Sequence, residues 1–177
     1  MTLNPEGPDA RTRLYMLDEL QRDLDARELY LSPLLTPSGQ LDWPVLLQFA
    51  LLEGGPAQLA EQLRRRHRLE HLVAPDPPRL RDGAQLLAEG EFNRFYCRGI
   101  CRRALDERHA RVEVYQAREA NRVRIADSQL LGSQLDARWL LSELRKSPDV
   151  SEAQVPGDPA AGLSVRLPQR AKRSIAA

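Results

Sequence analysis

Apolar residues recur at helical spacing near the start of the chain. Over residues 11–31, leucines return every three or four positions with charged residues between them, which predicts an amphipathic helix. The pair Ser32-Pro33 should end this helix, because the residue before a proline avoids helical backbone angles. The leucines of this pattern are Leu14, Leu17, Leu20 and Leu24.

A second helix is predicted to start at Asp42, with this residue as its N-cap. Pro44 then falls in the first turn, where the missing N–H costs no hydrogen bond. Residues 43–52 are apolar on nearly every side, so we expect this helix to be buried or to form an interface with another protein chain. A third helix should follow Pro56 and end in the basic run 64–68. The predicted interface residues are Trp43, Leu47, Phe49 and Leu51.

The clearest break in the pattern is the proline-rich stretch at 74–83, which we interpret as a linker. It separates a helical N-terminal region, residues 1–73, from a predicted small α+β domain at residues 84–168. Residues 169–177 form a short basic tail without an apolar period.

The C-terminal domain should combine one long helix with short strands. The apolar spacing predicts the helix between about 82 and 108, and Asp136 is a good N-cap for a shorter helix. Polar and apolar residues alternate at 111–118 and at 163–167, which predicts two strands that can pair. The predicted fold class is therefore α+β and mostly helical.

The composition limits the classes of protein to which this chain can belong. Hydrophobic residues make up 42% and charged residues 29% of the chain, which is typical of a globular protein. No stretch approaches the roughly 18 apolar residues that span a membrane, and the first residues lack the pattern of a signal peptide. We therefore expect no membrane partner and, by default, a place in the cytoplasm of the producing cell.

Arginine supplies nearly all of the positive charge, since only Lys146 and Lys172 are lysines among the 26 basic residues. Arginine suits contacts with phosphates and carboxylates, although the net charge of only +1 argues against a bulk polyanion binder. One row of arginines lies at helical spacing, and others lie near the C-terminus. These rows are either solvated faces with internal ion pairs or anion-binding sites. The candidate anion-binding residues are Arg94, Arg98, Arg102, Arg166, Arg170, Lys172 and Arg173.

Candidate catalytic chemistry is sparse. Residues 67–71 match the form H-x-x-E-H of some zinc enzymes, but the adjacent arginines disfavour a metal ion and no motif marks a third ligand. Cys97 and Cys101 lie four residues apart on the long predicted helix, and packing in the core explains them most simply. We therefore predict no catalytic residues, no metal and no cofactor.

Parts of the C-terminal domain resemble a family of bacterial and phage-like proteins that occurs in phage-derived gene sets. The similar segments are residues 87–105, 112–118 and 162–168, so the resemblance spans about residues 86–168. The family is richer in proline after the first strand, whereas residues 119–124 here contain none. The resemblance implies no catalytic residue.

Two functions are consistent with these features. The first is a non-enzymatic structural or assembly protein of a phage virion or phage-like particle, of the minor capsid, decoration or connector type, which binds protein subunits as a homo- or hetero-oligomer. The alternative is a nucleic-acid-associated protein that binds through the arginine row and the basic tail. Binding to nucleic acid that falls steeply with salt would favour the alternative.

Overall fold

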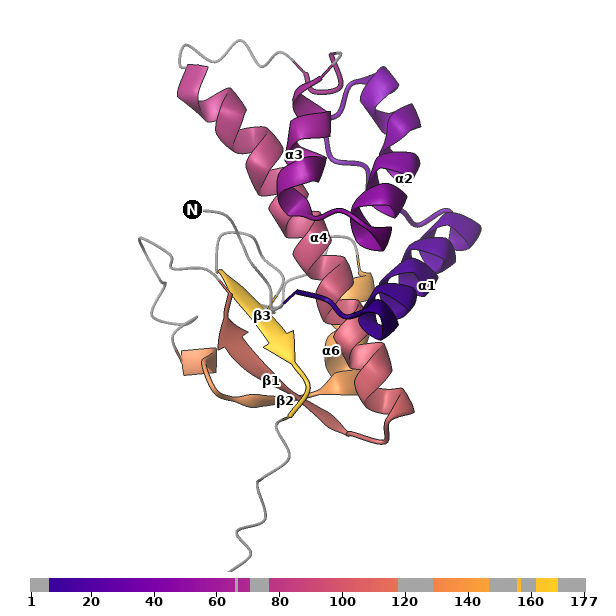
Figure 1. Cartoon of the computed structure of the whole chain (residues 1–177), viewed down its shortest axis with the longest axis vertical. Helices are drawn as coiled ribbons and strands as arrows, with labels where there is room; N and C mark the ends of the chain where they lie inside the picture. The colour runs from indigo at the N-terminus through magenta and orange to yellow at the C-terminus, as the bar shows by residue number, and fades with distance from the viewer. Residues whose placement is uncertain are drawn as a thin grey trace, which may run out of the picture.

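The computed structural model describes residues 7–65, 67–70, 77–117, 129–146, 156 and 162–168, with the side chains of 77–82 left aside. In these ranges, five helices accompany one three-stranded sheet, which confirms the mostly helical α+β class. The long helix α4 runs through the middle of the molecule, with α1–α3 on one side and the sheet on the other (Figure 1). The elements are α1 (Ala10–Ala26), α2 (Pro37–Leu52), α3 (Pro56–Arg64), α4 (Pro77–Asp106), β1 (Arg111–Gln116), β2 (Gln134–Asp136), α6 (Ala137–Arg145) and β3 (Leu163–Arg166).

Helix α1 is shorter than predicted at its C-terminal end. Asp9 caps its first turn by accepting a hydrogen bond from the Thr12 N–H. The helix ends when Arg27 adopts a left-handed conformation with φ 58°, five residues before Ser32-Pro33. A local cap therefore ends the helix before the proline does.

Helix α2 starts earlier than the predicted N-cap at Asp42. Thr36 is the actual cap, and its hydroxyl accepts from the Gly39 N–H, so that Pro44 lies inside the helix. Asp42 instead accepts a hydrogen bond of 2.8 Å from the Nε of Arg68. A Cβ at Gly39 would lie 2.1 Å from the Arg68 carbonyl oxygen, so only glycine permits this close approach. The segment after α3 thus determines where α2 begins.

The predicted linker at 74–83 does not separate two cores. Helix α4 begins at Pro77, inside that stretch, because proline is tolerated in the first turn of a helix; residues 74–76 lie outside the described ranges. Helices α1 and α3 pack on α4, and the buried apolar residues of the two predicted parts join in one cluster. The boundary placed at 74–83 therefore does not divide the packing of the described residues.

The sheet has the strand order β2-β1-β3, and both pairs are antiparallel. The predicted pairing of the two strands is confirmed, with Val114 opposite Val165. Strand β2 was not predicted, because three residues are too short to show an alternating pattern. Asp136 caps α6 as predicted, since its carboxylate accepts from the Trp139 N–H at 2.8 Å. Buried valines of β1 and β3 face α4 and close the core on this side.

Candidate functional site

Most of the predicted interface residues on α2 belong to the core of this chain. Trp43, Leu47 and Leu51 are fully buried, and the indole N–H of Trp43 donates to the Tyr30 carbonyl at 3.0 Å. The prediction that these three side chains contact another protein is wrong, because α2 packs them against α1, α3 and α4. Phe49 differs from them and remains partly exposed.

The opposite side of α2 is apolar too, and it faces solvent. Counted at 3.6 residues per turn, its four apolar side chains fall within an arc of about 80° and extend along about 16 Å of helix. We call them the α2 stripe: Leu41, Val45, Phe49 and Leu52, which are 82, 67, 46 and 44% exposed. Sequence periodicity could not separate this stripe from the buried side, because both sides of the helix are apolar.

The α2 stripe continues into a groove between α2 and α3. The groove encloses about 250 Å³ and is lined by Val45 and Phe49 of the stripe together with Leu46, Leu59 and two glutamines. No charged side chain lines this groove among the described residues. The surface is therefore suited to an apolar protein partner.

The predicted arginine row on α4 does not face solvent as a row. Arg98 is fully buried and donates to both oxygens of Asp23, at 2.6 and 2.7 Å, and to Glu19 at 2.9 Å. Its guanidinium also lies over the Phe95 ring, 4.9 Å from the centroid. Arg98 thus ties α4 to α1, so its predicted role in anion binding is wrong.

Glu19 is the centre of this buried ion network. Its carboxylate also accepts from Arg145 of α6 at 2.6 and 2.9 Å, so the network joins α1, α4 and α6. Burial alone raises the pKa of Glu19, but the hydrogen bond from Arg145 and the charge of Arg98 outweigh burial. The net pKa of Glu19 is therefore lowered, and the group stays ionised in the folded protein.

The other predicted anion-binding residues have different surroundings. Arg94 is buried and donates to the Leu144 carbonyl at the end of α6, so it does not face an external anion. Arg166 pairs with Glu113 across the sheet at 2.7 Å. Arg102 is partly exposed and lies 3.5 Å from Glu19. The three tail residues, Arg170, Lys172 and Arg173, lie outside the described ranges.

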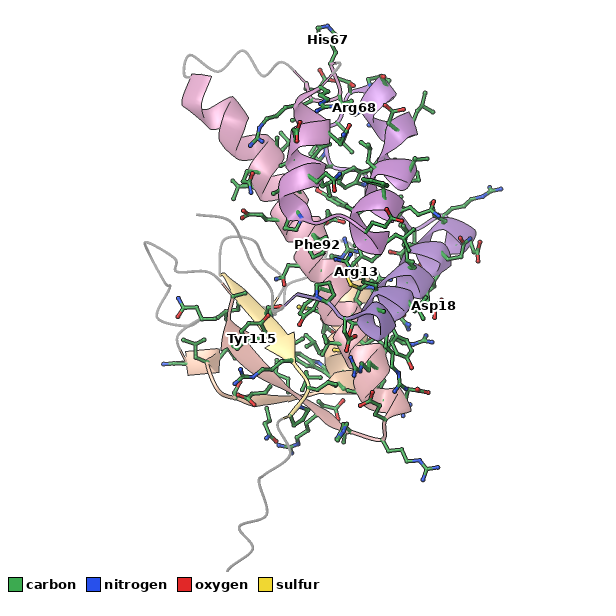
Figure 2. The ribbon with its side chains drawn as sticks, in the orientation of Figure 1. Arg13, Asp18, His67, Arg68, Phe92 and Tyr115 are labelled. Atoms are coloured by element: carbon green, nitrogen blue, oxygen red, sulfur yellow. The ribbon has the colours of Figure 1, made fainter. Side chains whose placement is uncertain are left out.

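The motifs with possible chemistry are not assembled into a reactive site within the described residues. His67 lies after the end of α3, and Figure 2 shows its side chain pointing away from the tip of the molecule. His71 is outside the described ranges. Burial raises the pKa of the Cys97 thiol to about 11, which keeps it protonated and unreactive. Among the described side chains, no three histidine, cysteine or acidic residues come together to hold a metal ion.

Comparison with protein-family models, curated proteins and solved structures found no match for this chain. Within the described ranges, none of the helices combines the length and apolar character that crossing a bilayer requires. The function must therefore be inferred from two features of the structure, namely the α2 stripe on the surface and the buried network around Glu19.

Proposed function

We propose that this chain is a non-enzymatic assembly protein and that the α2 stripe is the surface through which it associates. The observation that carries the proposal is the double apolar character of α2. One side completes the core, and the other exposes four large apolar side chains in a row. Single exposed apolar residues are common on proteins, but a continuous row that runs into a groove is typical of an interaction surface.

The partner that this surface fits best is a second copy of the chain. Helix α2 contains one charged residue, Asp42, and that carboxylate is paired with Arg68. The four side chains of the stripe are uncharged, so two stripes placed antiparallel pack apolar side chains against apolar side chains. In that arrangement Leu41 of one copy meets Leu52 of the other, and Val45 meets Phe49, as a two-fold interface requires.

The experiment that tests this proposal is sedimentation equilibrium over a wide range of protein concentration. We expect the wild-type chain to form a dimer, and we expect Val45→Gln with Phe49→Gln to shift it to a monomer. Leu14→Gln is the matched control, because Leu14 is 62% exposed on α1 and does not belong to the stripe. All three proteins should show the same circular dichroism, since each substitution is at an exposed or partly exposed position.

Two results would contradict the proposal. One is a wild-type chain that remains a monomer at every concentration. The other is a dimer that persists in the double variant, or that is lost equally in the Leu14 control. Either would mean that the α2 stripe is not where copies of this chain meet.

The setting we propose for this assembly is a phage virion or phage-like particle, or the cytoplasm of the cell that produces it. The support is the resemblance of residues 86–168 to phage-like proteins described above. The nucleic-acid alternative receives no comparable support, because two of the three arginines in its row, Arg94 and Arg98, are buried and engaged inside the chain.

A further inference from the structure

A hollow of about 360 Å³ lies between α1, α4 and α6, away from the α2 stripe. Three arginines line it: Arg102 from α4, and Arg138 and Arg145 from α6. The one carboxylate in its lining is Asp106, which belongs to the last turn of α4. The hollow is thus lined by more positive than negative groups.

The negative groups in and behind this hollow are already paired. Asp106 accepts from the Tyr15 hydroxyl at 2.6 Å and from Arg11 at 2.9 Å. The hydrogen bond from Tyr15, followed by that from Arg11, lowers the pKa of Asp106. Glu19 lies behind the hollow, and its carboxylate accepts hydrogen bonds from Arg145, which lines the hollow, and from the buried Arg98. Arg11 thus balances the charge of Asp106, and Arg98 and Arg145 balance that of Glu19. Neither carboxylate depends on Arg102 or Arg138 for its charge balance.

Arg138 is the arginine of the lining whose N–H donors are not used by other described residues. It is exposed in the first turn of α6, and within the described part of the chain no hydrogen bond or ion pair holds its guanidinium. Arg102 is partly exposed, and its one ion-pair distance is the 3.5 Å to Glu19. Guanidinium groups bind phosphate and carboxylate through two parallel N–H donors. Arg138 and Arg102 therefore offer such donors at the rim of a preformed hollow.

The remaining walls are apolar. Leu105 of α4 and Leu141 of α6 line the hollow, together with Tyr15 of α1. The volume lies in the range of small-molecule sites, roughly 300–1,000 Å³, and such sites combine apolar walls with a few placed polar groups. This lining suits a ligand with an anionic head and a small apolar body.

We propose that this hollow binds a small organic anion, with its phosphate or carboxylate group held by Arg138 and Arg102 and its apolar part against Leu105, Leu141 and the Tyr15 ring. The site is separate from the α2 stripe and does not depend on the proposed self-association.

Isothermal titration calorimetry with phenyl phosphate, benzoate and inorganic phosphate tests this proposal. We expect saturable binding of one equivalent of at least one aromatic anion, and weaker binding of inorganic phosphate because it has no apolar body. Comparing phenyl phosphate with benzoate identifies which head group the arginines prefer. We expect Arg138→Gln to weaken binding by about tenfold or more, through loss of a charge-assisted contact.

Arg111→Gln is the matched control, because it removes the same charge from an exposed arginine at the start of β1 that does not line the hollow. Equal melting temperatures of the three proteins would show that each variant is folded. The proposal is overturned if no probe binds, or if the control weakens binding as much as Arg138→Gln does. It is also overturned if a single-stranded oligonucleotide competes with the aromatic anions through Arg138 and binds more tightly than they do, because the site would then take a polymer.

Discussion

Replacing Arg98 by methionine should destabilise the protein strongly. The substitution keeps an unbranched stem as far as the position of the arginine Nε. It removes the guanidinium, and with it the donors to Glu19 and Asp23 and the contact with the Phe95 ring. Removing one partner of a buried ion pair typically costs about 3–5 kcal/mol, because a charge is left without its partner in the interior. The chain thus loses the group that neutralises two buried carboxylates.

The structure places this cost near the lower end of that range. Glu19 keeps its two bonds from Arg145, and Asp23 keeps Arg22 at 2.9 Å. Each carboxylate therefore retains one cation on its outer side. We expect a loss of about 3 kcal/mol in the free energy of unfolding. For a chain of this size that corresponds to a fall of roughly 6–12 °C in Tm.

Urea unfolding followed by circular dichroism measures this loss. Arg65→Met is the control, because Arg65 forms an exposed ion pair with Glu61 within α3 and its immediate flank, and such pairs contribute about 0–1 kcal/mol. A second variant, Arg98→Met with Glu19→Gln and Asp23→Asn, removes the buried charges together and should recover much of the stability. Equal costs for Arg98→Met and Arg65→Met would refute the reasoning.

The pH dependence provides an independent check. The pKa of Glu19 is lowered in the folded wild type, so its contribution to stability is complete above the ordinary value of 4.5 and is lost as the pH falls through the folded pKa. The Arg98→Met variant lacks much of this contribution. Its deficit relative to wild type should therefore shrink as the pH is lowered below 4.5. A deficit that is constant from neutral to acidic pH would mean that packing, and not charge, is what Arg98 supplies.

Three further predictions concern other buried positions of α4. Burial, only partly offset by Arg94, raises the pKa of Glu91 above 4.5, so the native state binds more protons than the unfolded state and stability falls as the pH rises above 4.5. Glu91→Gln should therefore gain stability relative to wild type as the pH rises above 4.5 in paired urea titrations, and a loss over that rise would contradict this. Gly99→Val should cost about 1–3 kcal/mol by thermal unfolding, because a Cβ there would lie 2.8 Å from the Met16 side chain, and an unchanged Tm would show that α1 shifts freely. Both cysteines should react with an aromatic disulfide reagent at pH 8 far more slowly in the native protein than in guanidinium chloride, since burial raises the pKa of each thiol, and rapid native reaction would show local opening of α4.

The sequence was a good guide to elements whose limits depend on local chemistry. The predicted cap at Asp136 is correct because its carboxylate bonds to a backbone N–H three residues away. The two alternating segments form paired strands because one face of each is covered by α4. Helix α2 shows the limit of such reasoning, because its start depends on contacts of Thr36 and Gly39 with His67 and Arg68, about thirty residues away.

The candidate sites were harder to predict than the fold. On α2, the pattern correctly indicated an apolar helix but could not tell which side faces the core, and three of the four chosen residues are on the buried side. On α4, the spacing of Arg94 and Arg98 is the same for a solvated row and for a buried row with distant partners. The acidic partners of Arg98 lie about 75 residues earlier in the chain, so only the fold brings them together.

The structure divides the arginines behind the net charge of +1 into two groups. Part of the arginine content acts inside the molecule, where Arg98 and Arg145 join three helices through Glu19. The remainder includes Arg138, which lies at the hollow with no partner in the described part of the chain. Helix α2 does not line that hollow, and α6 does not line the α2–α3 groove. Substitutions in the stripe should thus change self-association and leave anion binding intact, whereas Arg138→Gln should do the reverse. If either substitution changed both properties, the two surfaces would be parts of a single interface.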